Sequence, residues 1–544
     1  MFLENDIKNG FVPFPQDRAE YYQASGYWEN ENHIQLLDRI RKQYGNQLAI
    51  CQDDKSLSYD ELYHYAASYG SYLHQQGIKA EDFVVIQSPN VVEFFVVLFG
   101  LYYIGARPVF CLNGHGAYEI ENIAINSRAV GYIKINQENQ PTTDAMDISF
   151  GFTMPNLNLW FRQTIKSSSS IDQAFSCIND KTMLVPKYEA SPHSVAFLQL
   201  SGGTTGLPKL IPRTHADYLY SVKKSVEVTD LSASTKQLIV LPVMHNFTMS
   251  SPGFLGAFYS GASVFLSTDS SPKNCFSLIE KHGITQVSLV PSLINLWINS
   301  PQLEQADLKT LEVIQVGGAK LLPELAEAID QKLGAKLQQV YGMAEGLVNF
   351  TRLDDHSNTV LFTQGKALSK DDEILIVDEE GSPLPNESAG FILTRGPYTI
   401  NGYYNSPLVN SRSFNKEGFY ITGDIGYLDS NNNIVVTGRE KEQINRAGEK
   451  ITPSEIENLI LSHAQVKDVS VVGVKDSLLG ERTKASIILK EPTSQLSLRD
   501  VRVFLMQKKI AEYKLPDEIE LVDDFTYTQV GKVNKGLSTN KARG

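Results

Sequence analysis

Three glycines, three hydroxyl side chains and a lysine fall within ten consecutive residues of this chain, Leu200-Ser201-Gly202-Gly203-Thr204-Thr205-Gly206-Leu207-Pro208-Lys209. Glycine lets the backbone turn through positive φ and approach a ligand closely. Successive backbone N–H groups in such a turn form a concavity that binds anions. The hydroxyl donors and the Lys209 ammonium add to this, so the stretch predicts a phosphate-binding loop. The alternative is a flexible surface loop, since small polar residues are common in loops.

The stretch matches neither of the two commonest glycine-rich motifs. A Walker loop needs G-x-x-x-x-G-K-[ST] and a dinucleotide fingerprint needs G-x-G-x-x-G, and both spacings are missing here. The pattern S-G-[GS]-T-T-G-x-P-K instead resembles the phosphate loop of the adenylate-forming enzymes. That family includes acyl-CoA ligases, luciferases and the adenylation domains of nonribosomal peptide synthetases.

Further motifs of that family follow in the family's order, and the matches run from about residue 197 to residue 535. Tyr341-Gly342-Met343-Ala344-Glu345-Gly346 resembles Y-G-x-[TS]-E, whose glutamate holds Mg²⁺ near the ATP phosphates. Mg²⁺ prefers such hard oxygen ligands. Ala344 stands where Ser or Thr is usual, so this position has no hydroxyl to contact phosphate. The resemblance implies ATP and Mg²⁺ as cofactors, although the residues alone also fit a turn with a surface glutamate.

Two later motifs resemble the ribose-binding and hinge segments of the family. Tyr420-Ile421-Thr422-Gly423-Asp424 resembles Y-x-T-G-D, whose aspartate accepts hydrogen bonds from both ribose hydroxyls. Gly438-Arg439-Glu440-Lys441 resembles G-R-x-[DK], which implies that Arg439 reaches the nucleotide and that Lys441 is the hinge. The resemblance also implies that Gly448 lines the tunnel for a pantetheine thiol. Taken alone, a Gly-Asp pair is more often a simple turn.

The last motif is Gly531-Lys532-Val533-Asn534-Lys535, which resembles G-K-[VI]-x-[KR]. The resemblance implies that Lys532 is the catalytic lysine. It would bridge the substrate carboxylate and the α-phosphate, which is electrostatic stabilisation of the transition state rather than proton transfer. In isolation, a lysine in such a tail is more often an ordinary surface residue.

The segment Met244-His245-Asn246-Phe247-Thr248-Met249-Ser250-Ser251-Pro252-Gly253 resembles H-N-[YF]-P-L-[SA]-[SC]-P-G of the stand-alone aryl-acid ligases of siderophore synthesis. Thr248 and Met249 replace the usual Pro-Leu, which weakens the match. In those enzymes serine at the position of Ser251 accompanies 2,3-dihydroxybenzoate and cysteine accompanies salicylate; a thiol is the weaker hydrogen-bond partner. Gln315 and Asn349 are further matches to the family's pocket. The alternative is a loop with a structural histidine.

The resemblance assigns the candidate site residues as follows. The catalytic candidates are Lys532, Glu345 and His245, and the aryl-acid pocket candidates are Asn246, Phe247, Ser251, Gly317 and Val348. The ATP and AMP candidates are Ser201, Gly202, Gly203, Thr204, Thr205, Gly206, Lys209, Gly318, Ala319, Val340, Tyr341, Gly342, Glu345, Asp424, Arg439 and Lys532.

The elements that must position these motifs alternate between strands and helices. Residues 195–200 read as a strand that leads into the glycine-rich loop, and residues 83–87 read as another strand before a strongly apolar helix. Ser58 and Glu61 form a capping-box pattern at the start of a helix. From about residue 372 the pattern changes to short strands and turns. The residues therefore predict α/β alternation followed by a β-rich subdomain.

The length of 544 residues predicts at least two domains. Residues 441–544 carry 17 Lys+Arg against 15 Asp+Glu, whereas the preceding residues carry 32 against 47. We expect domains at 1–440 and 441–544. The resemblance implies a large N-terminal domain of layered α/β subdomains plus a β-rich subdomain, and a small mobile α+β C-terminal domain.

The net charge of −13 argues against a nucleic-acid partner. The most apolar run, residues 94–106, is too short to span a membrane. Four widely spaced cysteines without a CxxC pair fit a reducing compartment, so a cytoplasmic location is expected.

The resemblance implies an enzyme that activates 2,3-dihydroxybenzoate with ATP and transfers the aryl group to a phosphopantetheinylated aryl carrier protein. The alternatives are a salicylate-AMP ligase, an aryl- or acyl-CoA ligase that uses free coenzyme A, and a non-enzymatic nucleotide-binding regulatory protein. Retention of Glu345, Asp424, Arg439 and Lys532 speaks against the last of these.

Overall fold

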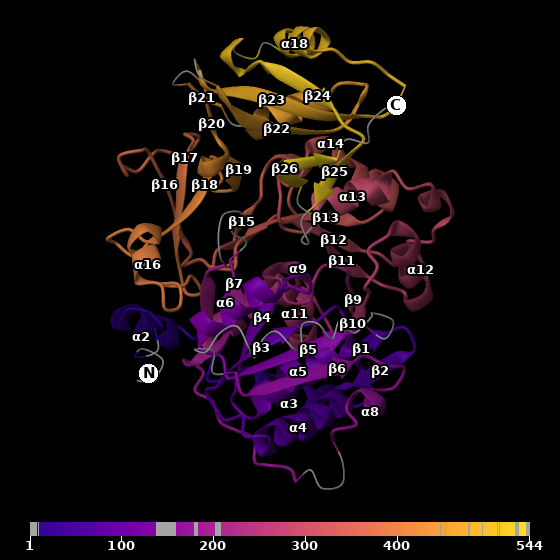
Figure 1. Cartoon of the computed structure of the whole chain (residues 1–544), viewed down its shortest axis with the longest axis vertical. Coiled ribbons are helices and arrows are strands. Elements are labelled where there is room, and N and C mark those ends of the chain that lie inside the picture. The colour runs from indigo at the N-terminus through magenta and orange to yellow at the C-terminus, as the bar shows by residue number, and fades with distance from the viewer. Residues whose placement is uncertain are drawn as a thin grey trace. The chain divides into compact units, whose positions relative to one another are not determined.

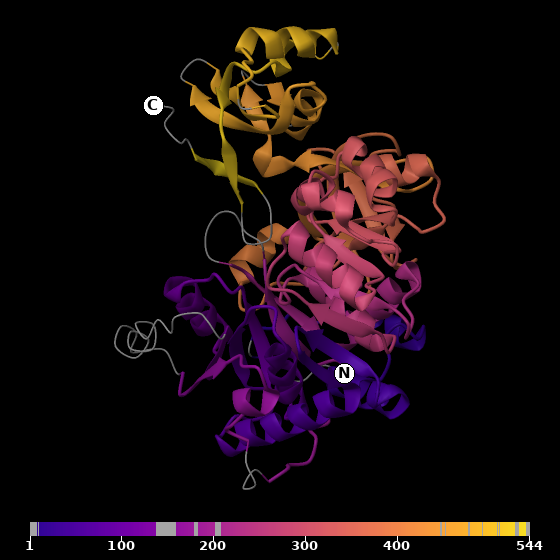
Figure 2. The ribbon, with the colours of Figure 1, turned by 90° about the vertical axis from the view of Figure 1, so that its right-hand side faces the viewer.

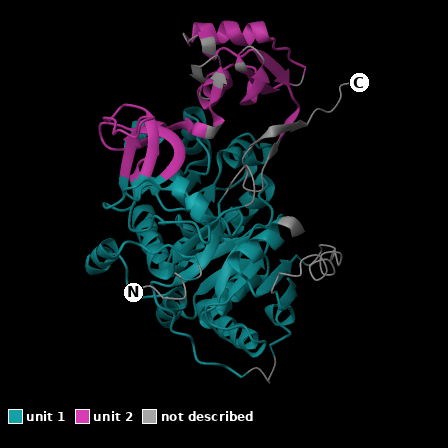
Figure 3. Cartoon of the chain, turned by 60° about the vertical axis from the view of Figure 1, so that its left-hand side comes forward, with its two compact units in different colours: residues 1–360, 367–373, 394–420 teal, residues 361–366, 374–393, 421–544 magenta. Residues whose placement is uncertain are grey.

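The computed structural model divides the chain into two units, coloured teal and magenta in Figure 3. The first unit comprises residues 1–360, 367–373 and 394–420, and the second comprises residues 361–366, 374–393 and 421–544. The structure describes residues 8, 10–137, 159–178, 183–201, 208–446, 449–451, 453–476, 479–491, 493–508, 510, 512–527 and 533–539.

A six-stranded sheet in the first unit carries the strand that leads into the glycine-rich loop. Its strands are parallel except for the antiparallel last pair, β7 and β8. The central strands β3, β4 and β7 are buried along almost their whole length, as in a parallel sheet covered on both faces, whereas β6 alternates between buried and exposed residues. In spatial order the strands are β6 (Phe161–Lys166), β5 (Gly131–Asn136), β3 (Phe83–Gln87), β4 (Arg107–Cys111), β7 (Val195–Leu200) and β8 (Leu210–Thr214).

A nine-stranded sheet carries Gly317 and Val348 of the predicted pocket residues. It is parallel from β1 to β13, and an antiparallel strand follows at each end, β2 beside β1 and β14 beside β13. In spatial order its strands are β15 (Lys366–Ala367), β14 (Val348–Phe350), β13 (Lys336–Gly342), β12 (Val313–Gly317), β11 (Gln286–Leu289), β9 (Lys236–Ile239), β10 (Ser263–Leu266), β1 (Leu48–Gln52) and β2 (Lys55–Ser58).

Helices packed between and around the two sheets complete a shared hydrophobic core. Every residue of α5 is buried, which confirms the interpretation of the apolar run as an interior helix. Ser58 and Glu61 cap α4 as a reciprocal capping box, as predicted. Helices α3 and α4 lie side by side (Figures 1 and 2). The core helices are α3 (His33–Tyr44), α4 (Tyr59–Gln75), α5 (Val92–Tyr103), α9 (His215–Thr229) and α11 (Gly253–Tyr259).

The other helices of the first unit complete its architecture. They are α2 (Gln16–Ala24), α6 (Ala117–Ser127), α8 (Ile171–Ala174), α10 (Asn246–Ser250), α12 (Pro272–His282), α13 (Pro291–Ile298), α14 (Pro323–Ala328), α15 (Ser357–Phe362) and α16 (Pro407–Ser413).

The second unit contains the predicted β-rich part and an α+β part with its own core. A four-stranded sheet contains β16 (Glu373–Val377), β17 (Gly390–Arg395), β18 (Tyr420–Leu428) and β19 (Ile434–Arg439). The α+β part contains β20 (Ile444–Arg446), β21 (Glu449–Ile451), α17 (Pro453–Leu461), β22 (Val466–Asp476), β23 (Gly480–Leu489), α18 (Leu498–Gln507) and β24 (Glu518–Leu521), followed by a hairpin of β25 (Asp524–Tyr527) and β26 (Val533–Thr539).

The α/β class is therefore confirmed, with a large N-terminal part of layered sheets and a small C-terminal α+β part. The boundary after residue 440 and the mobility of the C-terminal domain stay predictions. The four cysteines are free thiols. Among the described residues, no helix combines the length and apolar character that crossing a membrane requires.

A buried ion pair between Lys55 and Glu93 provides a stability prediction. The two atoms Nζ and Oε1 lie 2.8 Å apart, and the Glu93 side chain is fully buried. Lys55→Met leaves that carboxylate unpaired, so we expect the free energy of unfolding of the first unit to fall by about 3–5 kcal/mol. Urea denaturation followed by tryptophan fluorescence measures this, because all three tryptophans belong to the first unit.

Lys309→Met is the matched control for that substitution. Lys309 pairs with Asp307 at the surface, where its side chain is 88% exposed, so its loss is expected to leave the free energy of unfolding nearly unchanged. If both variants unfold at the same urea concentration, the Lys55–Glu93 pair does not contribute as the structure implies. Adding Glu93→Leu to Lys55→Met should recover most of the lost stability, because it removes the unpaired charge.

Candidate functional site

The hairpin of β7 and β8 presents the glycine-rich loop at one end of the six-stranded sheet. Backbone N–H of Ser201 donates to the carbonyl of Lys209 at 3.0 Å, and the N–H of Lys209 donates to Ser201 Oγ at 3.0 Å. The Ser201 hydroxyl therefore accepts a hydrogen bond that closes the base of the loop. Gly202, Gly203, Thr204, Thr205 and Gly206 lie outside the described residues, so their predicted phosphate contacts stay predictions.

Glu345 lies in the turn between β13 and β14, and a tyrosine connects it to Lys209. The Tyr403 hydroxyl donates to Glu345 Oε1 at 2.8 Å and accepts from Lys209 Nζ at 3.0 Å. It also lies 2.9 Å from the hydroxyl of Tyr420. The structure thus brings together two predicted nucleotide-site residues that are 136 positions apart in the sequence.

The hydroxyl of Tyr403 stays protonated in this setting. Burial, followed by the nearby Glu345 carboxylate, raises the pKa of Tyr403 well above its usual value. A protonated phenol can donate to a carboxylate while accepting from an ammonium. Lys209 Nζ also lies 4.1 Å from the centroid of the Tyr403 ring, within the range of a cation–π contact. The sequence alone does not point to Tyr403, because the segment Gly402-Tyr403-Tyr404 carries no charged group.

The position of Ala344, which departs from the family motif, is fixed through its backbone. Arg213 Nη1 donates to the carbonyl oxygen of Ala344 at 3.0 Å. Arg213 also forms a buried ion pair with Asp217, with Nε and Oδ1 2.8 Å apart. Burial raises the pKa of the Asp217 carboxyl, and the guanidinium opposes that shift. This pair therefore anchors the turn that carries Glu345 to α9.

The predicted aryl-pocket residues lie on or just after α10, at the end of β12 and in β14. A Cβ added at Gly317 would lie 2.8 Å from the Val340 carbonyl oxygen and 3.3 Å from Phe247 Cζ, so only glycine fits between them. A Cβ at Gly342 would lie 3.2 Å from the Val348 side chain. Ligands of α/β proteins commonly bind at the carboxyl ends of parallel strands.

Asn246 is oriented from two sides. Its Oδ1 accepts from the Tyr218 hydroxyl at 2.9 Å, and its Nδ2 lies 3.5 Å from the Met343 carbonyl oxygen. Burial raises the pKa of Tyr218, so its hydroxyl remains a donor. His245 caps α10 through Nδ1, which accepts from the Phe247 N–H at 3.3 Å. This contact gives His245 a structural role, while its predicted catalytic role stays a prediction.

Other pocket candidates are buried near the same elements. Ser251 is 2% exposed, and its Oγ lies 3.5 Å from that of Ser250. Val348 and Asn349 are buried in β14, and neither amide atom of Asn349 has a hydrogen-bond partner among the described residues. Gln315 is buried and donates to Gln338, so it is part of the sheet interior. Asn349 therefore offers a donor and an acceptor that no described residue uses.

The remaining nucleotide-site candidates lie at or just after the ends of β12 and β13. Gly318 and Ala319 follow β12 and are exposed, and Tyr341 and Gly342 end β13.

In the second unit, Asp424 on β18 and Arg439 on β19 are paired. They lie opposite each other in the antiparallel ladder, and Arg439 Nε donates to Asp424 Oδ1 at 2.7 Å. The Asp424 side chain is 5% exposed and that of Arg439 is 51% exposed. Lys441 lies in a short 3₁₀ helix, η3 (Glu440–Glu442). Gly448 and Lys532 lie outside the described residues, so their roles stay predictions.

The chemistry around Glu345 fits the implied Mg²⁺. Mg²⁺ in nucleotide sites is usually held by one or two carboxylates together with phosphates and waters rather than by a full protein cage. Glu345 supplies one buried carboxylate whose Oε1 is already held by Tyr403. Among the described residues no group of three or more His, Cys, Asp or Glu side chains could hold a metal by itself. A site completed by ATP phosphates agrees with this donor set.

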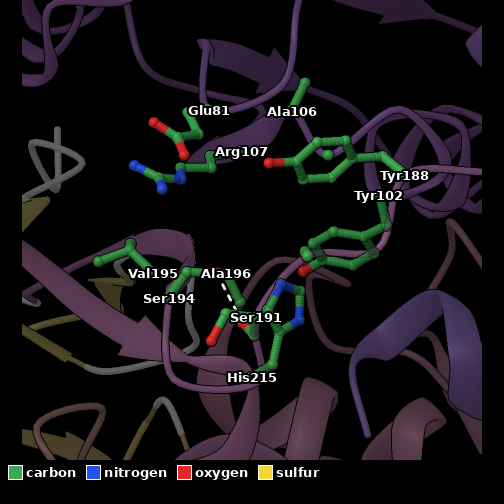
Figure 4. A pocket seen from close by; sticks show the side chains of 12 residues that line it. Glu81, Tyr102, Ala106, Arg107, Tyr188, Ser191, Ser194, Val195, Ala196 and His215 are labelled. Atoms are coloured by element: carbon green, nitrogen blue, oxygen red, sulfur yellow. Dashed lines mark hydrogen bonds between the residues drawn. The ribbon is translucent and has the colours of Figure 1, made fainter. Parts of the chain in front are cut away.

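A small cavity elsewhere in the first unit is not the substrate site. It has a volume of about 10 Å³, enough for about one water. The side chains of Tyr102, Tyr188, Arg107 and His215 line it (Figure 4). A site for a small organic ligand typically needs at least about 300 Å³.

Comparisons with known proteins agree with these observations. A family model for the AMP-binding enzyme matches residues 37–404, and one for the AMP-binding enzyme C-terminal domain matches residues 455–532. The chain is 41% identical over 527 residues to the vibriobactin-specific 2,3-dihydroxybenzoate-AMP ligase of Vibrio cholerae, which covers 96% of each chain. It is 39% identical over 534 residues to the salicyl-AMP ligase / salicyl-S-ArCP synthetase of Mycobacterium tuberculosis, which covers 97% of this chain and 93% of that one.

The chain is also similar to a solved structure over nearly its whole length. The apo structure of MbtA from Mycobacterium smegmatis has a TM-score of 0.74 and 36% identity, and the match covers 97% of this chain and 98% of that one. The chain therefore belongs to the adenylate-forming AMP-binding enzymes, in the branch of the aryl-acid AMP ligases. The family resemblance found in the sequence is confirmed, while the relatives do not agree on one aryl acid.

Proposed function

We propose that this chain activates 2,3-dihydroxybenzoate with ATP and transfers the aryl group to the phosphopantetheine thiol of an aryl carrier protein in siderophore biosynthesis. One observation supports this most. The hairpin of β13 and β14 carries Glu345 in its turn, and its strands carry Val340 and Val348. Val340 and Phe247 both lie close to Gly317. A carboxylate suited to a nucleotide's cation and residues predicted for the aryl-acid pocket are thus neighbours, which supports reaction between the two substrates.

In the first half-reaction, an oxygen of the aryl carboxylate attacks the α-phosphorus of ATP. A new oxygen–phosphorus bond forms, the bond to the bridging oxygen of the β-phosphate breaks, and pyrophosphate leaves with that electron pair. A benzoate-type acid is ionised at neutral pH, so no general base is needed. The protein's task is to offset the repulsion between two anions. Lys209, the loop at 201–209 and Lys532 supply positive charge and donors for this.

Mg²⁺ held by Glu345 and the phosphates would neutralise part of the polyphosphate charge. Tyr403 holds one oxygen of that carboxylate in place. Asp424 would receive the ribose hydroxyls and Arg439 would reach the nucleotide. These roles extend the family's pattern to the matching positions of this chain.

In the second half-reaction, rotation about Lys441 would bring Gly448 to the path of the thiol. The thiol sulfur attacks the carbonyl carbon of the aryl adenylate, a thioester forms, and AMP leaves. The slightly basic C-terminal part would meet an acidic carrier protein better than the acidic remainder of the chain.

The choice of 2,3-dihydroxybenzoate rests on Ser251 and Val348. A serine hydroxyl can pair with the second ring hydroxyl, which salicylate lacks. The resemblance links a bulkier leucine at the position of Val348 to salicylate. Relatives named for 2,3-dihydroxybenzoate and for salicylate are about equally similar to this chain, so overall similarity does not distinguish the two acids.

ATP–pyrophosphate exchange with 2,3-dihydroxybenzoate, salicylate, benzoate and coumarate tests the substrate. We expect 2,3-dihydroxybenzoate to give the highest kcat/KM, by about tenfold over salicylate, and Ser251→Cys to narrow that ratio. A preference for salicylate in the unaltered chain would overturn the assignment. Offering either an aryl carrier protein or free coenzyme A as acceptor then separates a carrier-dependent ligase from a coenzyme A ligase.

A further inference from the structure

We propose that Tyr403 is a positioning residue that keeps Lys209 and Glu345 apart and aligned for a magnesium–nucleotide complex. The inference rests on the proposed function for the role of Glu345. Tyr403 itself touches neither reacting group in this proposal and acts through its two charged neighbours.

The contacts of Tyr403 match such a role. A single buried hydroxyl accepts from an ammonium at 3.0 Å and donates to a carboxylate at 2.8 Å. Hydrogen bonds with a charged partner are about twice as strong as neutral ones. The Tyr420 hydroxyl at 2.9 Å adds a third partner, so the phenol oxygen is fixed from three directions.

The hydroxyl also acts as a spacer. Opposite charges at close range in a poorly hydrated site attract strongly. Without the intervening oxygen, the Lys209 ammonium and the Glu345 carboxylate could form a direct ion pair. That pair would withdraw a carboxylate oxygen from Mg²⁺ and a positive charge from the phosphates.

The segment around Tyr403 holds the whole Glu345 turn. Ile400 N–H donates to the Glu345 carbonyl at 2.8 Å, and the backbone of Thr399 leaves no room for a Cβ at Gly346. The Tyr398 hydroxyl accepts from the Val348 N–H at 3.4 Å. It also donates to Asp372, whose pKa burial raises to about 7. One short segment thus fixes both the predicted magnesium ligand and a predicted pocket residue.

Tyr403→Phe tests the inference, because it removes the hydroxyl and keeps the ring. Isothermal titration calorimetry of the full chain measures ATP affinity with Mg²⁺ and with EDTA. We expect ATP affinity to fall about tenfold with Mg²⁺ and to change less than about twofold in EDTA. In exchange assays, kcat should fall and recover partly at raised Mg²⁺, while the KM for the aryl acid stays unchanged.

Tyr404→Phe is the matched control. Tyr404 is the next residue, and its ring packs against Phe83 with centroids 5.3 Å apart, in a separate core cluster. This variant should bind ATP as the unaltered chain does in both conditions. The inference would be overturned if Tyr403→Phe lost the same amount of ATP affinity with and without Mg²⁺, or lost no ATP affinity at all.

A double-mutant cycle with Glu345→Gln provides a second test. If Tyr403 acts through Glu345, then Tyr403→Phe should change magnesium-dependent ATP affinity by less than about twofold in the Glu345→Gln background. Full additivity would contradict the inference. Both tests measure nucleotide binding and not aryl-acid activation. If the unaltered chain binds ATP with Mg²⁺ but activates no aryl acid, the proposed function is refuted. The inference about Tyr403 would still hold in that case.

Discussion

Lys532→Ala is expected to lower the rate of aryl-acid adenylation by about 100- to 1,000-fold, because the transition state loses a positive charge where two anions meet. ATP affinity should change little, since the loop at 201–209 and Glu345 remain. ATP–pyrophosphate exchange and calorimetry measure the two effects separately. Transfer from a preformed aryl adenylate to the thiol should fall less, because no polyphosphate is present in that step.

Lys541→Ala is the control for Lys532→Ala, since it removes a lysine of the same tail outside the motif. It should exchange pyrophosphate as the unaltered chain does. Near-normal exchange by Lys532→Ala would show that the family's catalytic lysine does not correspond to this position.

Glu345→Gln is expected to lower kcat for exchange by about 100-fold and to raise the Mg²⁺ concentration needed for half-maximal rate. Glutamine keeps the shape of the side chain and an oxygen that can accept from Tyr403, so the change isolates the charge. Initial rates over a series of Mg²⁺ concentrations measure this effect.

Glu324→Gln, at an exposed position of α14, is the control for that charge loss. It should leave the Mg²⁺ dependence unchanged. If Glu345→Gln follows the same Mg²⁺ curve as this control, Glu345 is not the magnesium ligand.

Elements with a strong local pattern could be predicted from the sequence. The apolar run before the glycine-rich loop is β7, and the capping box at Ser58 and Glu61 starts α4. The strands expected at residues 83–87 and 195–200 are β3 and β7. The local sequence indicates which segments are buried and where helices are capped. The residue at which a strand ends depends instead on its neighbours in the sheet.

Motif spacing identifies the candidate site residues, but it does not identify their partners in the fold. Tyr403 contacts Glu345 across 58 positions and Lys209 across 194 positions. Asp424 and Arg439 pair because their strands adopt one particular register. No local pattern encodes these contacts, since they arise only when distant segments pack together. For the same reason, the sequence alone does not show that the Asn349 amide has no hydrogen-bond partner among the residues that the structure describes.

The most direct test of the account is whether the purified chain, given ATP, Mg²⁺ and 2,3-dihydroxybenzoate, forms an aryl adenylate. Mass spectrometry of the quenched reaction detects the adenylate, and exchange of labelled pyrophosphate into ATP measures its reversible formation. The account predicts aryl-AMP and exchange that depend on both the acid and Mg²⁺. Absence of any aryl-AMP with every hydroxylated benzoate offered would contradict it.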